Sequence, residues 1–211
     1  MSPFISIIIP FYGTADPVLL QRCLDSIRRQ GMEEGSYEII VVDDNGKGLG
    51  GARNQGIRQA TGTYLMFVDA DDYLFPNLSY CFPYLLKYTP DVCSFQMCEV
   101  NRPGVIPQSF NYKWEVYESG AEYMSKNNFM GTAWRHFFSR SFLNIHGLAF
   151  AESCFHEDED FVAKAYCLAS TTLITDYPVY AYFRSSSSII HERALQIRLK
   201  RLNDFRGMLY R

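Results

Sequence analysis

The chain has 211 residues, of which 47% are hydrophobic and 16% aromatic, and its formal net charge is −3. These values predict a folded chain with a substantial core and argue against intrinsic disorder. Without a long basic run, nucleic acid is not an expected partner, and no apolar stretch is long enough for a membrane span. The six cysteines form no CxxC pair and follow no signal peptide, which favours reduced thiols in a cytoplasmic protein.

The first 76 residues predict strands that alternate with helices. The strands are expected at residues 4–9, 37–42 and 63–68, and the helices at residues 17–30 and 52–61. Pro10 is expected to end the first strand, and Asp16 followed by Pro17 is a typical helix start. Strand, helix and strand in this order are typical of a parallel sheet with right-handed crossovers.

The remaining residues predict a less regular mixture of elements. Helices are expected at 78–88 and 157–168, strands at 92–97, at 134–138, near Leu173 and near Tyr180, and an irregular stretch at 101–117. Residues 193–211 combine basic residues with leucines at helical spacing, which favours an amphipathic surface helix. Docking of that helix on a membrane or on a partner is the alternative interpretation. No linker or repeat divides the chain, so residues 1–211 are predicted to form a single mixed α/β domain.

Acidic residues follow two of the predicted strands. Asp69, Asp71 and Asp72 come after the third strand, and Asp43 and Asp44 come after the second. Ligands of open α/β sheets bind outside the carboxyl ends of the strands, and clustered carboxylates need a positive partner. The first group is therefore a candidate site for a divalent cation together with substrate phosphates. An Asp-rich turn or helix cap is the alternative.

Two further segments are candidates for a functional site. Residues 43–54 combine glycines, a helix start and Arg53, which favours phosphate binding, although glycines that only turn the chain are the alternative. This segment matches neither GxxxxGK[ST] nor a proper GxGxxG motif. Residues 157–160 are four consecutive acids at a helix start, and capping or catalysis explains them equally well.

Several motifs, taken together and in this order, resemble glycosyltransferase family 2. Those of the first half are Ser6-Ile7-Ile8-Ile9-Pro10-Phe11-Tyr12, Cys23-Leu24-Asp25-Ser26-Ile27, Ile40-Val41-Val42-Asp43-Asp44, Gly51-Ala52-Arg53-Asn54-Gln55-Gly56-Ile57 and Phe67-Val68-Asp69-Ala70-Asp71-Asp72. Residues 157–161 resemble the later ED-x-x-F motif of the family, and Tyr182-Phe183-Arg184 with Ser188-Ile189 resembles its closing Tyr-x-Arg…Ser-Ile segment. Each fragment is modest by itself, but their order and spacing make the match specific.

The resemblance implies the GT-A fold, a Rossmann-like nucleotide-diphospho-sugar transferase fold with a mostly parallel sheet flanked by helices. It implies transfer of a sugar from a nucleotide donor, usually linked to UDP, with inversion at the anomeric carbon. Asp158 would be the catalytic base, with Glu157 supporting it. The implied nucleotide-binding residues are Pro10, Phe11, Tyr12, Asp43, Asp44, Arg53, Asp69 and Arg184.

The resemblance also implies a metal cofactor, Mn²⁺ or Mg²⁺. Asp69 and Asp71 would be its acids, with Asp71 favoured as the direct ligand. His191 is a further candidate because some GT-A enzymes use a late histidine, but a surface histidine at a helix start is the more common case.

The expected organisation follows from these roles. Residues 1–76 would form the nucleotide-binding half, residues 77–192 the acceptor-side half and residues 193–211 the C-terminal helix. The expected partners are a nucleotide-diphosphate sugar and a glycan or lipid-linked acceptor of a polysaccharide pathway. Peripheral association with the inner face of the membrane and a homodimer are further expectations.

The chain departs from the family between Asp44 and Arg53. Most members carry an additional helix and strand here, whereas only Asn45 to Ala52 intervene in this chain. Either the additional helix and strand are truly deleted, or the sequence as read omits a flexible segment. A true deletion would leave part of the donor pocket open, and we favour the omitted segment. The deletion motivates an alternative function, a non-catalytic module that binds nucleotide sugars. A nucleotidyltransferase is disfavoured because the loop at 11–16 has no basic residue.

Overall fold

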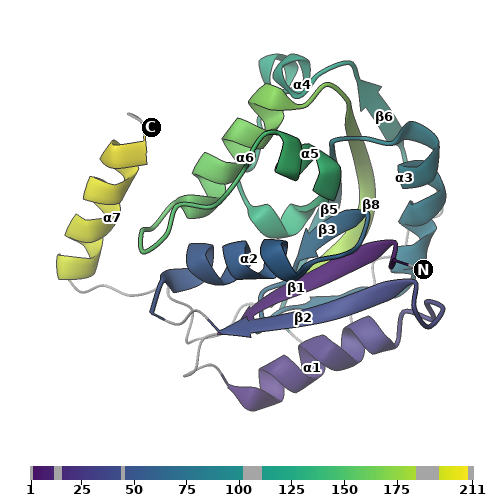
Figure 1. Ribbon diagram of the computed structural model, residues 1–211, viewed down its shortest axis with the longest axis horizontal. Helices are drawn as coiled ribbons and strands as arrows, with labels where there is room; N and C mark the ends of the chain where they lie inside the picture. The colour runs from purple at the N-terminus through teal and green to yellow at the C-terminus, as the bar shows by residue number, and fades with distance from the viewer. Residues whose placement is uncertain (1, 12–15, 44–45, 102–110, 184–194, 209–211) are drawn as a thin grey trace.

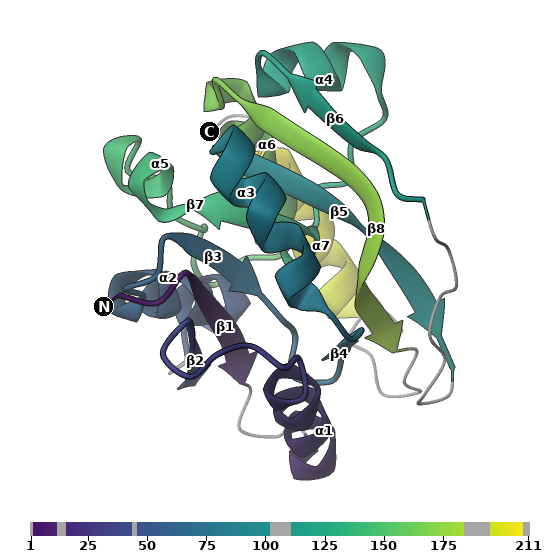
Figure 2. The same ribbon diagram turned by 90° about the vertical axis from the view of Figure 1, so that its right-hand side faces the viewer.

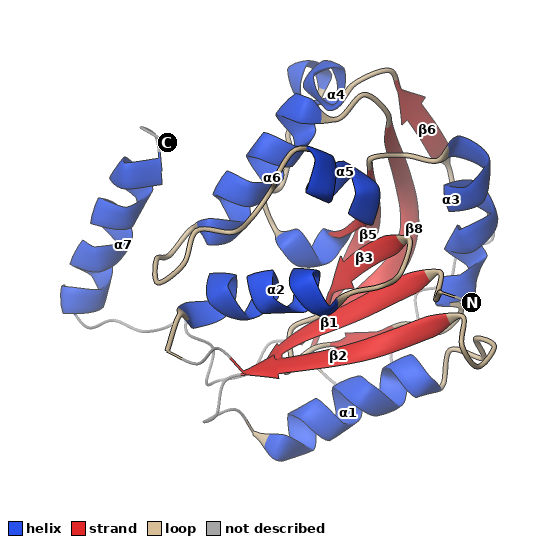
Figure 3. Cartoon of the chain, viewed as in Figure 1, coloured by secondary structure: helices blue, strands red, loops and turns tan. Residues whose placement is uncertain are grey.

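The computed structural model describes residues 2–11, 16–43, 46–101, 111–183 and 195–208. Within them, an eight-stranded sheet carries helices on both faces (Figures 1 and 3). The strands are β1 (Ile5–Phe11), β2 (Tyr37–Asp43), β3 (Tyr64–Phe67), β4 (Tyr73–Leu74), β5 (Val92–Val100), β6 (Trp114–Tyr117), β7 (His136–Ser139) and β8 (Thr172–Phe183). The helices are α1 (Pro17–Arg28), α2 (Gly48–Gln59), α3 (Phe82–Tyr88), α4 (Gly120–Lys126), α5 (Arg140–Ile145), α6 (Glu157–Leu168) and α7 (Leu195–Met208). Short 3₁₀ turns occupy Leu78–Cys81 and Ala133–Arg135.

The strand order is β2-β1-β3-β7-β5-β8-β4, and β6 pairs with β8. β1 runs parallel to β2 and β3, and β5 runs parallel to β8. Because β7 is antiparallel to both β3 and β5, the strands β1, β2, β3, β5 and β8 all run in one direction. The sheet is therefore mixed but mostly parallel, as predicted, and the carboxyl ends of β2 and β3 lie on the same side of it.

The two faces of the sheet are covered by different helices. Ile7 and Ile9 of β1 belong to the core that includes Cys23 and Ile27 of α1. Ile8 points to the opposite face, into the core that includes α2, α5 and α6. Figure 2, a view at right angles to Figure 1, shows α3 in front of the strands, and Leu85 of α3 belongs to the same core as Cys23 and Ile27. This alternation along β1 is the period-two pattern of a strand buried on both faces.

The elements of the first half and α6 are confirmed, with changes at their ends. β1 continues through Pro10 to Phe11, because Pro10 pairs only with Val42 on the β2 side, and the pairing with β3 ends at Ile8. The missing N–H of proline therefore breaks no ladder bond there. α2 begins at Gly48 rather than Ala52, so it includes Gly48, Gly50 and Gly51 of the expected glycine-rich turn.

The second half differs more from the sequence prediction. The two short strands expected near Leu173 and Tyr180 are one continuous strand, β8. The strand expected at 134–138 begins at His136, because Ala133–Arg135 forms a 3₁₀ turn. The irregular stretch at 101–117 contains β6, and β4, α4 and α5 were not predicted. All of these additional elements are short, so their residues carry little periodic signal.

The C-terminal helix is present as α7, and two of its leucines face solvent: Leu199 is 51% exposed and Leu202 is 66% exposed. The helix contacts the loop before α6 through both polar groups and rings. Lys200 Nζ donates to Ser153 O, Asp204 accepts from the backbone N–H of Phe155, and the ring of Phe205 lies 5.4 Å from that of His156. Within the described residues, no helix has both the length and the apolar character needed to cross a bilayer.

Candidate functional site

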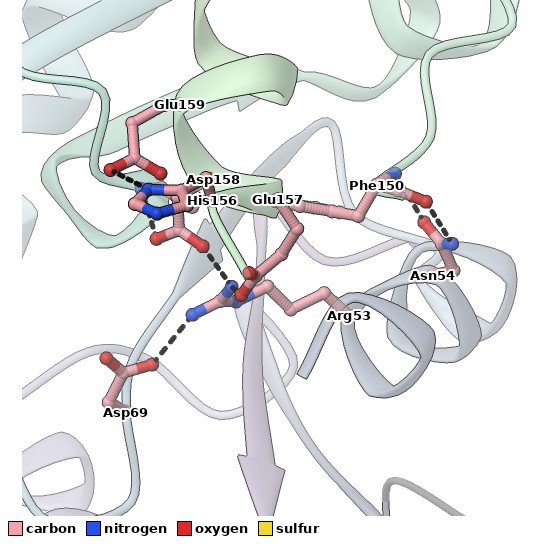
Figure 4. Close-up of polar contacts among 9 residues, drawn as sticks. Arg53, Asn54, Asp69, Phe150, His156, Glu157, Asp158 and Glu159 are labelled. Carbon is pink, nitrogen blue, oxygen red and sulfur yellow. Dashed lines mark hydrogen bonds and ion pairs between the residues drawn. The ribbon is translucent and has the colours of Figure 1, made fainter. Parts of the chain in front are cut away.

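The centre of the candidate site is the buried side chain of Arg53, which is 1% exposed (Figure 4). Its Nη1 donates to Glu157 Oε1 at 2.9 Å and also to Asp158 Oδ1. Its Nη2 donates to Asp69 Oδ1 at 3.2 Å. One guanidinium thus joins the carboxyl end of β3 to the first turn of α6. A planar fork of donors suits this task because it can hold several carboxylates in fixed directions at once.

Close packing of α2 brings Arg53 to this position. A Cβ on Gly56 would lie 2.3 Å from Ile8 Cγ2, so the helix approaches β1 as closely as only glycine allows. Asn54 is fixed by a reciprocal pair of hydrogen bonds: it donates to Phe150 O at 2.9 Å and accepts from Phe150 N–H at 2.8 Å. The ring of Phe150 lies 5.4 Å from the Arg53 guanidinium carbon and stacks on Phe161 of α6. The residues between Gly51 and Gly56 therefore position the side chain of Arg53 against α6.

The four acids that begin α6 have different partners. Glu157 and Asp158 contact Arg53, whereas Asp160 accepts from Lys164 Nζ at 2.9 Å and Glu159 lies 3.3 Å from His156 Nδ1. The second oxygen of Asp158 accepts the backbone N–H of Ala133 at 3.2 Å. Both oxygens of Asp158 are thus oriented by donors, while its side chain keeps 17% exposure to solvent. Capping of the helix accounts for none of these contacts.

The site carries more negative than positive charge. Three carboxylates surround one guanidinium, and the pKa values respond accordingly. Burial, with the nearby Asp158 and Asp71, raises the pKa of Asp69 to about 6, although Arg53 opposes this shift. Burial and the charge of Asp158 also raise the pKa of Glu157. Burial disfavours the charge on Arg53, but Asp158, Asp69 and Glu157 outweigh it and raise the pKa of Arg53 above its usual value. An additional cation would relieve the remaining excess of negative charge.

The structure brings together some of the predicted site residues but not all of them. Arg53, Asp69, Glu157 and Asp158 meet directly, and Pro10, Phe11 and Asp43 lie at the neighbouring carboxyl ends of β1 and β2. Tyr12, Asp44, Arg184 and His191 lie outside the described residues, so their roles stay predictions. The contact of Arg53 with the α6 acids was not predicted, because nothing in the sequence spacing links residues so far apart.

A metal ion fits this site only with help from a ligand. Among the described residues, no group of three or more His, Cys, Asp or Glu side chains is arranged to hold a metal. Burial raises the pKa of the Asp71 carboxyl, and it raises the pKa of Asp69 even though Arg53 contacts that acid, so a further cation would favour the charged form of both. Two carboxylates are the protein ligands that Mg²⁺ commonly has when substrate phosphates supply the others. The residues present therefore fit a cation that is shared with a diphosphate.

Arg22 and Tyr180 also contact the turn after β3 and were not predicted, whereas Asp72 was predicted as a site acid but has another role. Arg22 of α1 donates to the carbonyl of Asp71, and Tyr180 of β8 accepts the backbone N–H of Asp69 at 3.0 Å. Asp72 is 1% exposed and faces β8 instead of the Arg53 cluster. Tyr180 and Asp72 lie within a predicted strand and a predicted acid cluster, but the sequence offered no signal that they pair.

Comparison with known protein families gives a match over most of the chain. The family model described as Glycosyl transferase family 2 matches residues 6–47 and 45–144. The two matched stretches meet at the short connection between β2 and α2, where the sequence already departs from the family. The putative glycosyltransferase EpsH of Bacillus subtilis (strain 168) is 26% identical over 224 residues, covering 90% of this chain and 63% of that protein. The chain thus spans less than two thirds of that relative.

Solved structures share the fold. TarS 1–349 of S. aureus in complex with UDP-GlcNAc has a TM-score of 0.74 and 22% sequence identity, covering 92% of this chain and 62% of that one. The mannosyltransferase PcManGT from Pyrobaculum calidifontis, in complex with GDP-Man and Mn²⁺, has a TM-score of 0.58 and 16% identity, covering 99% of this chain and 63% of that one. These likenesses confirm the predicted GT-A fold.

Burial of Asp72 predicts that the free energy of unfolding falls as the pH rises from about 6 to about 8. Burial and the charge of Asp69 raise the pKa of Asp72 to about 8, whereas the unfolded value is about 4. Between these two pKa values the folded chain therefore binds more protons than the unfolded chain. The free energy of unfolding consequently falls as the pH rises, by roughly 2 kcal/mol for Asp72 between pH 6 and 8. Urea denaturation in EDTA at several pH values measures the effect.

The matched variants measure the share of Asp72 in this pH dependence. Asp72→Asn should reduce the pH dependence but not abolish it, because burial raises the pKa of Glu157 to about 8 as well. Glu122→Gln, which changes a half-buried acid of α4, should leave the pH dependence unchanged. A free energy of unfolding that stays level or rises between pH 6 and 8 in the unmodified protein contradicts the assignment.

Proposed function

The chain belongs to glycosyltransferase family 2, and from this membership we propose that it transfers a sugar from a nucleotide-diphosphate donor, with a UDP-sugar favoured, to a hydroxyl group of a glycan or lipid-linked acceptor. The observation that carries the proposal is the Arg53 bridge between Asp69 at the end of β3 and Asp158 at the start of α6. The bridge holds Asp69, which is suited to the donor side, and Asp158, which is suited to the acceptor side, in one fixed arrangement. EpsH, named as a putative glycosyltransferase, supports the same reaction class.

The proposed mechanism assigns Asp158 as the general base. Its carboxylate is oriented by Arg53 and by the backbone N–H of Ala133, and it is still partly exposed to solvent, where an acceptor can approach. It takes the proton from the acceptor hydroxyl as the oxygen attacks the anomeric carbon from the face opposite the leaving diphosphate, which inverts that carbon. Glu157 supports the base by sharing the Nη1 of Arg53.

The proposal includes a divalent cation. Asp69 and Asp71 would hold Mn²⁺ or Mg²⁺, with Asp71 as the direct ligand, and PcManGT, solved with GDP-Man and Mn²⁺, supports this choice. When bound, the ion would neutralise negative charge on the leaving diphosphate as a Lewis acid. UDP is favoured as the nucleotide because TarS, which has the same fold, was solved with UDP-GlcNAc.

We also propose that the protein acts in polysaccharide biosynthesis in the cytoplasm, as a peripheral protein at the inner face of the membrane. The support is the outer side of α7, which combines the exposed Leu199 and Leu202 with the exposed Arg198 and Arg206. A helix with apolar and basic residues on its open side suits the interface of an anionic bilayer. This position would bring the loop before α6, which contacts α7, close to a lipid-linked acceptor.

A second candidate function is a non-catalytic module that binds nucleotide sugars. The observation in its favour is the direct connection from β2 to α2, with α2 beginning at Gly48, where family members carry more residues. Such a module would bind the donor but would neither transfer the sugar nor hydrolyse the donor slowly. Activity assays with the bound donor separate the two functions.

Replacing the proposed base tests the mechanism. Asp158→Asn keeps the size of the side chain but removes its ability to accept a proton, so transfer should fall by roughly 10²- to 10⁴-fold. Donor affinity should change by less than about twofold, since the base does not bind the nucleotide. Glu159→Gln, at an exposed position on the same helical turn, is the control and should retain activity. Normal turnover by Asp158→Asn means that the base is another group.

Replacing the proposed metal ligand tests the donor site separately. UDP with Mn²⁺ should raise the melting temperature of the unmodified protein, because a ligand that binds only the folded state stabilises it. Asp71→Ala should abolish this increase, whereas Asp176→Ala, an acid in the middle of β8, should not. An equal increase in Asp71→Ala and the unmodified protein rules out Asp71 as a ligand.

A further inference from the structure

The turn that carries Asp69 and Asp71 is held from behind by one tyrosine hydroxyl. Tyr180 Oη accepts the backbone N–H of Asp69 at 3.0 Å and donates to Asp72 Oδ2 at 2.7 Å. Tyr180 is fully buried and its ring stacks on Trp134, with 4.6 Å between the ring centroids. The ring is thus packed independently of the hydroxyl, and the two hydrogen bonds are an additional feature of this tyrosine.

Asp72 completes the connection between the turn and β8. Its Oδ1 accepts the backbone N–H of Phe183 at 2.7 Å, and its own backbone N–H donates to Asp69 O at 3.0 Å. Both carboxylate oxygens of Asp72 therefore already have donors, and the side chain is 1% exposed. The third acid of the cluster is directed into the protein, while Asp69 is directed toward Arg53. Asp72 serves the backbone of the turn and has no free oxygen directed at a ligand.

Arg22 holds the same turn from the side of α1. It donates through Nη2 to the carbonyl of Asp71, and its guanidinium carbon lies 4.0 Å from the ring centroid of Phe183. The same carbon lies 5.2 Å from the ring centroid of Tyr73. The Arg22 guanidinium thus contacts two aromatic rings and one carbonyl, and these contacts link α1 to the turn and to the end of β8.

From these contacts we propose that Tyr180, Asp72 and Arg22 are positioning residues that fix the Asp69–Asp71 turn for the diphosphate of the donor. The inference rests on the proposed function and deepens it, since it explains how two repelling carboxylates are kept near each other before any cation arrives. The three residues act through the backbone N–H of Asp69, the carbonyl of Asp71 and the backbone of Phe183.

The contacts have a definite physical consequence. Asp69 and Asp71 are partly buried and repel each other, so an unanchored turn would relax by moving the two side chains apart. Anchors at both ends of the turn prevent this relaxation, and binding then does not have to order the turn again. Loss of an anchor should consequently appear as weaker binding of the diphosphate and as faster opening of the turn.

Tyr180→Phe is the decisive variant because it removes the hydroxyl and keeps the ring. We expect the affinity for UDP in the presence of Mn²⁺, measured by titration calorimetry, to fall by about tenfold, the equivalent of one hydrogen bond. Amide hydrogen exchange of the backbone from Asp69 to Asp72, measured without ligand, should become faster by a similar factor. A purely structural role would lower the melting temperature but would leave the affinity of the folded protein unchanged.

Tyr177→Phe is the matched control, because Tyr177 belongs to the same strand and its hydroxyl donates to Asn77 O, at a distance from the turn. It should alter neither quantity by more than about twofold. A second pair of variants is Arg22→Met, in the middle of α1, and Arg28→Met, at its C-terminal end. This pair should behave in the same way as the tyrosine pair, since Arg28 is exposed and contacts only Asp25 among the described ion pairs.

The outcomes separate this inference from the proposed function. Unchanged exchange in Tyr180→Phe overturns the inference, and so does faster exchange with unchanged affinity for UDP. If the unmodified protein itself binds no UDP, the proposed choice of a UDP-linked donor is wrong, and exchange alone decides whether the three residues anchor the turn. Faster exchange and weaker binding in Tyr180→Phe and Arg22→Met, with both controls unchanged, support it.

Discussion

The site depends on a single buried guanidinium. Arg53 is almost completely removed from solvent, which is costly for a charged group unless it is paired. Its partners come from two distant parts of the chain, the end of β3 and the start of α6, so the charge can be satisfied only when the two halves of the domain are correctly docked. Three carboxylates share one cation, and the surplus negative charge makes the same cluster suited to a further positive ligand.

The rest of the fold supports this arrangement by leaving its elements little freedom. Gly56 allows α2 to lie directly against Ile8 of β1, and the paired hydrogen bonds between Asn54 and Phe150 fix the helix against the loop before α6. On the far side, Tyr180 and Arg22 hold the turn that presents Asp69. The acids are thus fixed by backbone contacts from several elements, and preorganisation of this kind is what makes electrostatic catalysis effective.

The sequence predicted the long periodic elements and the chemistry at their ends, but not the contacts between them. Buried runs such as 63–68 and the Asp16 cap of α1 follow local rules, so the parallel half of the sheet could be predicted. The sequence predicted two strands in place of β8 because Asp176 and Pro178 interrupt its apolar pattern. The strand continues through Pro178 because the pairing with β5 is irregular at that residue. Arg53 was assigned to the nucleotide, and its burial between Glu157 and Asp158 depends on tertiary packing that no spacing encodes. The same holds for Asp72, which resembles its neighbours in sequence but is directed into the core.

The central claim is that the acids joined by Arg53 form a site for sugar transfer from a nucleotide donor. A screen for slow donor hydrolysis across nucleotide sugars, with and without Mn²⁺, tests it most directly, because water can replace the unknown acceptor. We expect hydrolysis of sugars linked to one nucleotide, with UDP favoured, and we expect this hydrolysis to depend on the metal. Binding of a donor without hydrolysis of any nucleotide sugar would contradict the catalytic role of the site.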